Sequence, residues 1–383
     1  MSTQLTNRAA SIDSLQRLAK KRIPGFAWEY LSGGCNHDVA VQRNRSALDQ
    51  VLLEPHYLDG QTLVSTSVDL LGTNYSAPLG VAPLGLGGII WPHAAEAHAE
   101  AARSLGIPYV LSTLATTSIE TAAKCAGESL WFQLYPPKDE TIRADLIQRA
   151  LAVGCRHLVV TIDVPVAGRR PRDMQNGLAI PPRIDARSVF QAACRPAWSV
   201  ATLRAGLPQF ASIMPYVDPG ASLSEIADYI RIQLKAVVDR KLLQTIRESW
   251  PHQLIVKGIL NPADARIAVE CGADAIIVSN HGGRQLDAAV ATIDRLPHII
   301  ETVGEKTTVM VDSGVESGVD IARFIASGAA LVFSGRAFMY GVGAFGPAGA
   351  VHAGQLLCSE FEQVMSQLRC ATPAELSKHL VKN

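Results

Sequence analysis

His281, two glycines and Arg284 follow the apolar segment Ala275–Val278 within six residues, inside the run Ser279–Asp287. Histidine titrates near neutral pH and can take a proton from a substrate, whereas arginine can form two parallel hydrogen bonds with a carboxylate. Glycines let a ligand approach the backbone closely. This pattern predicts a site that binds an anionic substrate and removes a proton from it.

Seven other short apolar segments also end in polar or glycine residues, and alanine-rich segments with helical periodicity separate most of them. The eight predicted strands are Pro78–Pro83, Tyr109–Ser112, Leu130–Tyr135, His157–Asp163, Leu254–Gly258, Ala275–Asn280, Thr308–Ser313 and Leu331–Gly335. The clearest helices are Ala94–Leu105, Thr141–Ala152, Ala263–Cys271 and Gly318–Ser327. Eight such units in about 260 residues predict an α/β protein with a (β/α)8 TIM barrel. A doubly wound sheet is the alternative, but it gives no reason for so many polar strand ends.

In a barrel, the polar residues at the strand ends meet at one mouth. They are Ser112, Gln133, Tyr135, Thr161, Asp163, Lys257, Ser279, His281, Asp312, Gly335 and Arg336. The serine, threonine and glutamine side chains suit the edge of a flat heteroaromatic ring, and Gly335-Arg336 suits a phosphate. The alternative is that each residue has only a local structural role, as a helix cap, a solvent-exposed lysine or a loop histidine. Together they predict a phosphate-bearing aromatic cofactor.

The bulk composition excludes several classes of protein. The 383 residues carry 35 lysines and arginines against 35 aspartates and glutamates, so no net charge favours binding to nucleic acid. The seven cysteines have no CxxC spacing, and several lie in apolar runs, such as Cys155 and Cys271, which indicates reduced core residues. We expect no metal, because no pair of histidines has ligand spacing with a carboxylate nearby. Without an apolar signal core or a run long enough to span a membrane, the chain is expected to be cytoplasmic.

One interval between strands is unusually long, because Asp163 and Lys257 are 94 positions apart (257 minus 163). The excess, residues 172–230, is rich in proline, arginine and aromatic residues, and we interpret it as a lid inserted after the fourth strand. The alternative is contact with a membrane, which the arginines at positions 183, 187, 195 and 204 support only weakly.

The first 75 residues are expected to form a helical cap, with helices near Ser11–Lys21 and Pro24–Gly34. The barrel then occupies residues 76–373 of a single domain, 1–383.

With these residues in view, the chain resembles the FMN-dependent α-hydroxy acid oxidase and dehydrogenase family, which includes glycolate oxidase, L-lactate dehydrogenase and (S)-mandelate dehydrogenase. The resemblance runs from about Ile12 to about Pro373. It rests on Ser279–Asp287, Thr161–Pro165 with Gly168–Arg170, Trp131–Tyr135 and Val256–Gly258, and Arg195–Trp198 is most similar to the mandelate and lactate dehydrogenase branch.

The resemblance implies FMN as the cofactor and oxidation of an (S)-2-hydroxy acid to the 2-oxo acid, with hydride or its equivalent passing to flavin N5. It implies His281 as the base, with Asp163 stabilising its charged form. The remaining expected catalytic residues bind the substrate, its carboxylate by Arg170, Arg284 and Tyr30 and its hydroxyl by Tyr135.

The resemblance also implies the residues that hold the cofactor. Lys257 would lie by the pyrimidine end of the flavin, where negative charge accumulates on reduction. The others are Ser112, Gln133, Thr161 and Ser279 at the ring, the Pro83, Leu84 and Gly85 backbone near N5, Asp312 and Gly314 at the ribityl chain, and Gly335 and Arg336 at the phosphate.

Glu316 departs from the family pattern, in which an arginine that binds the phosphate usually stands at this position. Two like charges in contact repel by roughly 1 to 4 kcal/mol. The sequence therefore predicts weaker FMN binding, unless Glu316 turns to solvent and Arg336 compensates. A homologue that has lost flavin and acts as a binding or scaffold protein is an alternative. A pyridoxal phosphate barrel that uses Lys257 as a Schiff base is a weaker one.

Leu114 and Ala167 are expected to surround the variable group of the substrate, and their modest size favours mandelate-like or medium aliphatic acids over glycolate. The electron acceptor stays open between oxygen, a quinone and a protein, so an oxygen-using oxidase is an alternative to a dehydrogenase. A homotetramer or larger assembly is expected, with possible peripheral contact of residues 172–230 with the inner face of the membrane.

Overall fold

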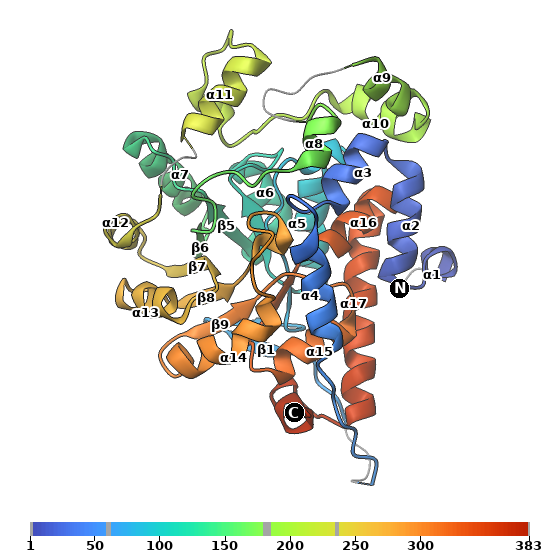
Figure 1. The fold of residues 1–383 in the computed structure, drawn as a ribbon, viewed down its shortest axis with the longest axis vertical. Coiled ribbons are helices and arrows are strands. Elements are labelled where there is room, and N and C mark those ends of the chain that lie inside the picture. The colour runs from blue at the N-terminus through green and yellow to red at the C-terminus, as the bar shows by residue number, and fades with distance from the viewer. Residues whose placement is uncertain (1–2, 59–62, 179–184, 234–236, 382–383) are drawn as a thin grey trace.

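Eight parallel strands close into a barrel in the computed structural model, which describes residues 3–58, 63–178, 185–233 and 237–381. The order of neighbours around the barrel is β10-β3-β4-β5-β6-β7-β8-β9 (Figure 1). The strands are β3 (Leu79–Val81), β4 (Tyr109–Ser112), β5 (Leu130–Leu134), β6 (His157–Thr161), β7 (Gln253–Ile259), β8 (Ala275–Val278), β9 (Thr308–Val311) and β10 (Val332–Ser334). The predicted TIM barrel is confirmed, and only β7 extends beyond its predicted segment.

Successive side chains of each strand point to opposite faces of the sheet, so both faces are buried. In β6, Val159 packs inside the barrel, whereas Leu158 and Val160 pack outward under the helices. A short antiparallel hairpin, β1 (Val68–Leu70) and β2 (Thr73–Tyr75), adds to the inner cluster. Trp131 Nε1, near the start of β5, donates to the Tyr75 hydroxyl at 3.2 Å. The hairpin therefore closes the amino-terminal end of the barrel, and the sequence did not predict it.

Helices surround the barrel, and four of them begin and end within one residue of the predicted positions. They are α5 (Ala94–Leu105), α6 (Ile119–Ala126), α7 (Glu140–Ala152), α12 (Arg240–Ser249), α13 (Pro262–Glu270), α14 (Thr292–Val303), α15 (Gly318–Ala326), α16 (Arg336–Phe345) and α17 (Pro347–Leu368). Side chains cap several of their first turns, as when Ser317 accepts from the Asp320 N–H at the start of α15. These helices cover the outer face of the sheet and leave its carboxyl end for the site.

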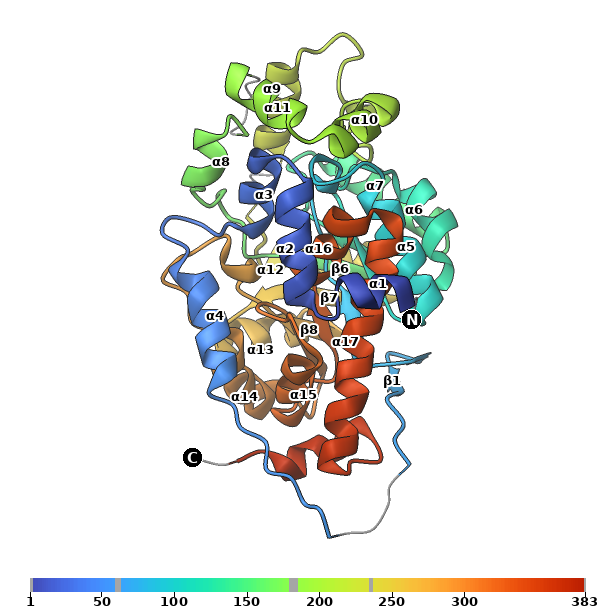
Figure 2. The same cartoon turned by 90° about the vertical axis from the view of Figure 1, so that its right-hand side faces the viewer.

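Four helices precede the barrel, where two were expected. They are α1 (Thr3–Arg8), α2 (Ile12–Arg22), α3 (Gly25–Ser32) and α4 (Val39–Asp49). In both ribbon views α2 lies against α16, and α4 runs along the outside of the barrel (Figures 1 and 2). The hairpin and α4 make this region more than a cap of two helices, and its division from the barrel stays a prediction.

The long segment after β6 forms α8 (Pro171–Gln175), α9 (Ala186–Ala193), α10 (Pro196–Ala205) and α11 (Leu223–Gln233). Helices α9, α10 and α11 lie at one end of the molecule beyond α3, with α11 apart from α9 and α10, whereas α8 lies beside α3 (Figures 1 and 2). Trp198 of α10 is buried and donates to the carbonyl oxygens of Ile89 and Ile90, each at 3.1 Å. The segment is therefore anchored on the barrel mouth, although part of it, including Arg183, lies outside the described residues.

Candidate active site

His281 follows β8 in a short 3-10 helix, η4 (His281–Gly283), and adopts a left-handed backbone conformation with φ of 59°. Its Nδ1 lies 3.0 and 3.2 Å from the two carboxylate oxygens of Asp163, and its Nε2 lies 3.2 Å from the Tyr135 hydroxyl. An ionised carboxylate only accepts, so Nδ1 carries the hydrogen and Nε2 is the basic nitrogen. The ring can therefore take a proton at the side that faces Tyr135.

Asp163 stays ionised despite its burial. Burial alone would raise the pKa of its carboxyl, but the charges of His281 and Lys257 and the hydrogen bonds with His281 outweigh it and hold the pKa below its usual value. Gly258 makes room for this carboxylate, because a Cβ at that position would lie 2.7 Å from Asp163 Cβ. The pair His281–Asp163 is thus built to hold a positive charge on the imidazole.

Tyr135 lies close to the other five predicted catalytic residues. Burial raises the pKa of its hydroxyl, and the Asp163 carboxylate raises it further, so the phenol stays protonated and can donate. Arg170, Tyr30 and Arg284 are also close enough to act on its charge. The structure therefore brings all six predicted catalytic residues to one place, although their roles stay predictions.

Arg284 and Arg170 both lie near Tyr135, but they differ in their hydrogen bonds. Arg284 Nη1 donates to the carbonyl oxygens of Tyr30 and Gly33 at 2.8 and 2.7 Å, and its guanidinium lies 5.0 Å from the centre of the Tyr30 ring. Burial, together with Arg170, lowers the pKa of Arg284 to about 10, so it remains charged at neutral pH. Arg170 Nε is buried without a hydrogen-bond partner within the described chain. An unpaired buried donor beside a second cation fits a substrate carboxylate.

Asp173 of α8 is a site residue that the sequence analysis missed. Its buried carboxylate lies 3.6 Å from Arg170 Nη1 and also feels the charge of Arg284. Burial raises the pKa of Asp173, and the two arginines oppose that effect. The one available signal was its position three residues after Arg170, on the same face of a helix.

The expected ring end of the cofactor is polar and well ordered. Lys257 Nζ donates to Ser279 Oγ at 2.7 Å and lies 2.9 Å from Asp312 Oδ2. Burial would lower the pKa of Lys257, but the charges of Asp312 and Asp163 outweigh it and raise the pKa. Gln133 Nε2 donates to Thr161 Oγ1 at 3.0 Å, and its Oε1 is a buried acceptor with no partner among the described residues. A buried cation and an unpaired acceptor fit a flavin ring, whose edge carries an N–H and accumulates negative charge.

Other predicted cofactor residues lie around this ring end. Ser112 Oγ accepts from the Leu114 N–H at 3.2 Å, and the Gly85 carbonyl accepts from the Tyr30 hydroxyl at 3.1 Å. Asp312 is bonded to Lys257 and to the Ser313 hydroxyl, so its carboxylate faces the ring end rather than an open ribityl site. Its predicted contact with the ribityl chain therefore stays a prediction.

The expected phosphate end fits less well. Arg336, the first residue of α16 after Gly335, donates through Nε to the Leu31 carbonyl and through Nη2 to the Gly33 carbonyl. The Glu316 side chain is partly buried near this guanidinium, and no ion pair joins them in the described part of the chain. Burial raises the pKa of Glu316, and Arg336 opposes that effect. The expected phosphate end thus has the Arg336 guanidinium, which is already bonded to backbone carbonyls, and the Glu316 carboxylate, whose negative charge would repel a phosphate.

Comparisons with known proteins find relatives that match nearly the whole chain. A family model described as FMN-dependent dehydrogenase matches residues 19–383. The chain is 36% identical to (S)-mandelate dehydrogenase of Pseudomonas putida over 373 residues, which cover 97% of this chain and 94% of that protein. It is 35% identical to L-lactate dehydrogenase of Alcaligenes faecalis over 373 residues, which cover 97% and 98%.

Solved structures are similar over the same length. The crystal structure of the monotopic membrane protein (S)-mandelate dehydrogenase matches with a TM-score of 0.92 and 36% identity, covering 97% of this chain and 99% of that one. A mandelate oxidase structure with (S)-mandelic acid matches with a TM-score of 0.81 and 32% identity, covering 97% and 98%.

Proposed function

Because this chain belongs to the FMN-dependent dehydrogenase family, whose members are 2-hydroxy acid oxidoreductases, we propose that it oxidises an (S)-2-hydroxy acid to the 2-oxo acid. The observation that carries the proposal is His281, placed between the Asp163 carboxylate and the Tyr135 hydroxyl with Arg170 and Arg284 nearby. FMN, when bound, supplies the two-electron acceptor.

The chain's own residues account for substrate binding and proton transfer. Arg170 and Arg284 would bind the substrate carboxylate, which satisfies the unpaired Arg170 Nε. Tyr135 would donate to or accept from the substrate hydroxyl, beside His281 Nε2. His281 Nε2 would take the proton, and Asp163 would stabilise the resulting imidazolium. Lys257 would offset the negative charge at the ring end.

The test is the colour of the purified protein and its loss of colour with substrate. We expect yellow protein that absorbs in the flavin bands and bleaches without oxygen when an (S)-2-hydroxy acid is added. His281→Gln should slow this bleaching by about 10²- to 10⁴-fold, because the general base is lost, while FMN binding stays within a few-fold. Bleaching at the wild-type rate in this variant would contradict the mechanism.

The substrate is proposed to be a mandelate-like or lactate-like acid. Two observations support this proposal. The mandelate and lactate dehydrogenases named above share 36% and 35% identity with this chain, and the side chains expected beside the substrate, Leu114 and Ala167, are of modest size. Initial rates on glycolate, L-lactate and (S)-mandelate decide the point, and fastest turnover of glycolate would contradict it. The electron acceptor is either oxygen, as in an oxidase, or a quinone or protein, as in a dehydrogenase. Formation of hydrogen peroxide during turnover distinguishes the two.

A homologue that binds little flavin and acts as a binding or scaffold protein is the second candidate, and Glu316 is the observation that favours it. A colourless protein that fails to bind added FMN would support this candidate. Yellow protein that bleaches with substrate would exclude it.

Helices α9 and α10 are also proposed to contact a membrane surface. Phe190 of α9, Leu203 of α10 and Leu207, which follows α10, are 69%, 83% and 67% exposed. Arg187 is three residues before Phe190, and Arg204 directly follows Leu203. Apolar side chains beside cations suit the boundary of an anionic bilayer. One similar structure is of a protein named as a monotopic membrane protein. Within the described residues, no helix is long and apolar enough to cross a membrane.

A further inference from the structure

We infer that helix α4 positions both loops of the site, with Asn44 holding the loop of the proposed base and the next residue, Arg45, holding the loop of the proposed cofactor. The inference rests on the proposed function, since it assigns the two loops to His281 and to FMN. Within the described residues, no hydrogen bond or ion pair joins Asn44 or Arg45 to His281 or to the other proposed catalytic side chains, so both are positioning residues.

Asn44 is paired with Asn280, the residue directly before His281. Each amide donates to the other, with Asn44 Nδ2 to Asn280 Oδ1 at 2.9 Å and Asn280 Nδ2 to Asn44 Oδ1 at 2.6 Å. Asn280 Oδ1 also accepts from the Gly283 N–H at 3.1 Å, and both asparagines are buried. The pair therefore fixes the turn in which His281 adopts its left-handed conformation.

The amino-terminal end of α4 is fastened to the same loop. The Asp287 carboxylate accepts from the N–H groups of His37 and Ala40, each at 2.9 Å, at the start of the helix. Asp38, at the N-cap position, makes no side-chain cap bond, so Asp287 supplies the negative charge that a helix N-terminus favours. Hydrogen bonds thus join α4 to the loop that follows β8.

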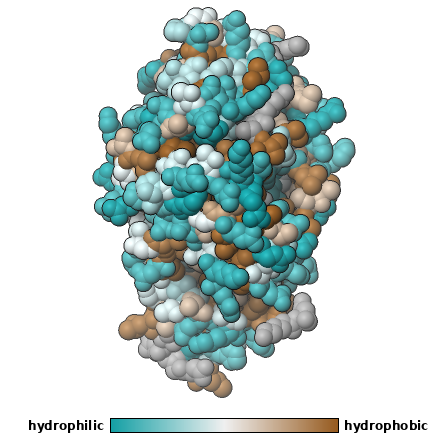
Figure 3. All heavy atoms as spheres, turned by 90° about the vertical axis from the view of Figure 1, so that its left-hand side faces the viewer, coloured by the Kyte–Doolittle hydropathy of each residue, from teal (hydrophilic) through white to brown (hydrophobic). Residues whose placement is uncertain are grey.

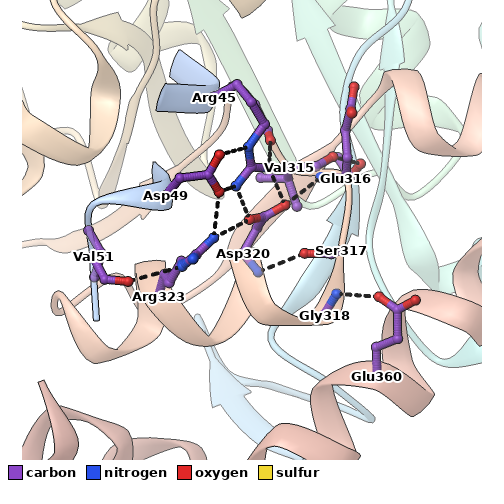
Figure 4. Close-up of polar contacts among 12 residues, drawn as sticks. Arg45, Asp49, Val51, Val315, Glu316, Ser317, Gly318, Asp320, Arg323 and Glu360 are labelled. Atoms are coloured by element: carbon purple, nitrogen blue, oxygen red, sulfur yellow. Dashed lines mark hydrogen bonds and ion pairs between the residues drawn. The ribbon is translucent and has the colours of Figure 1, made fainter. Parts of the chain in front are cut away.

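Arg45 reaches the other loop through Asp320 of α15. Its Nη1 and Nη2 donate to the two oxygens of the fully buried Asp320 carboxylate, at 2.7 and 2.6 Å (Figure 4). Asp320 Oδ2 also accepts from the Glu316 N–H at 3.0 Å, and Arg45 Nη1 lies 3.4 Å from the Gly314 carbonyl. The Arg45–Asp320 pair therefore holds the backbone of residues 314–316, while the Glu316 side chain points away from it (Figure 4).

Two glycines show how closely α4 approaches both loops. A Cβ on Gly283 would lie 2.7 Å from the Val41 N, and Gly283 has a φ of +75°. A Cβ on Gly314 would lie 3.1 Å from Leu48 Cδ1 and 3.2 Å from Asn44 Cβ, and Gly314 has a φ of +87°. Since side chains rarely adopt these φ values and would meet α4, the helix and the two loops form one tightly fitted unit.

The test separates the role of Asn44 from that of Arg45 by measuring cofactor binding and flavin reduction independently. In Asn44→Ala, the rate of anaerobic flavin reduction by saturating substrate should fall about 10- to 100-fold, because the base is misplaced, while the FMN dissociation constant of the apoprotein stays within threefold. In Arg45→Gln, the FMN dissociation constant should rise about 10- to 100-fold, while the FMN-saturated variant reduces its flavin within threefold of wild type. Arg45→Lys, which keeps the charge but loses the bidentate geometry, should lie between wild type and Arg45→Gln, and it serves where the latter does not fold.

A control variant changes α4 without affecting either loop. Ser46→Ala replaces an exposed residue of the helix next to Arg45 and should leave FMN binding and flavin reduction unchanged.

Amide hydrogen exchange without FMN gives a readout that does not depend on the reaction. Arg45→Gln should speed exchange at Glu316, and Asn44→Ala should speed exchange at Gly283. Equal effects of both variants on both measurements, or lower melting temperatures with neither measurement changed, would overturn the inference. If both variants change amide exchange as expected but the wild-type protein binds no FMN, the proposed function is contradicted and the positioning role of α4 is not.

Discussion

Glu316 lies at the proposed phosphate end of the cofactor site, beside the Arg336 guanidinium. The charged and titratable groups that act on it are Arg336, Asp320, Arg45 and Asp13, and it acts in turn on Tyr340. Its pKa is raised by burial, so the folded protein binds a proton that the unfolded chain releases at lower pH. The stability that Glu316 contributes is therefore complete below its ordinary pKa and is lost as pH rises through the folded value.

Replacement Glu316→Gln should remove this pH dependence and strengthen FMN binding. Without the like charge, FMN should bind at least about fivefold more tightly at pH 8, and the advantage should shrink towards pH 5, where the carboxyl of the wild type is more protonated. Titration of apoprotein with FMN between pH 5 and 8 measures this. Equal affinity of both proteins across the range would show that Glu316 does not face the phosphate.

Most residues of the candidate site could be predicted from the sequence, because they end strands and the barrel brings strand ends together. Asp173 could not, since it lies in the insertion, and a single aspartate after Arg169, Arg170 and Arg172 is typical of an ordinary surface ion pair. Asn44, Arg45 and Asp320 could not either, because their partners are 236 and 275 positions away and no local pattern indicates them.

At the scale of elements, the eight barrel strands and four of the helices between them followed from apolar runs and periodicity, whereas α4 and the β1–β2 hairpin did not. Helix α4 buries only Ala40, Asn44 and Leu48, a single stripe whose central member is polar, so it gives no amphipathic signal. The hairpin has strands of three residues each, too short for alternation to show. Both elements depend on tertiary contacts that local sequence does not encode.

The close fit of α4 against η4 predicts that Gly283→Ala is destabilising. Its Cβ would strain a backbone with φ of +75° and also meet Val41, so the free energy of unfolding should fall by at least about 1 to 3 kcal/mol. Gly154→Ala is a matched control, because Gly154 has a φ of +78° but nothing within 4 Å of the added Cβ. Urea unfolding of both variants separates strain from steric overlap. Equal losses would show that α4 can move away from η4 at little energetic cost.

At the scale of the whole molecule, the surface mixes polar and apolar groups. On the face seen in Figure 3, hydrophilic and hydrophobic residues are interspersed, in keeping with a chain of 35 basic and 35 acidic residues. Helices α9 and α10 differ because their exposed apolar residues Phe190 and Leu203 lie on two neighbouring helices, with exposed Leu207 just after α10. The homotetramer that the resemblance implies stays a prediction, which light scattering of the purified protein can test.

The proposed membrane contact predicts that charge on α9 or α10 releases the protein from vesicles. Phe190→Asp and Leu203→Asp should each reduce co-sedimentation with anionic phospholipid vesicles several-fold, because burying a carboxylate in the bilayer boundary is unfavourable. Leu58→Asp is the control, since Leu58 is 100% exposed in the segment at the opposite end of the molecule (Figure 2). Unchanged sedimentation of all three variants would exclude α9 and α10 as the attachment site.

The carbonyl of Gly33, at the end of α3, accepts hydrogen bonds from both Arg284 and Arg336. One backbone oxygen thus serves the cation proposed for the substrate and the cation proposed for the cofactor. Gly33 itself has little freedom to change, because a Cβ there would lie 2.7 Å from the Glu29 carbonyl oxygen. Selection for a new substrate that shifts the end of α3 would therefore also alter cofactor retention, so directed evolution of this pocket has to screen for both properties at once.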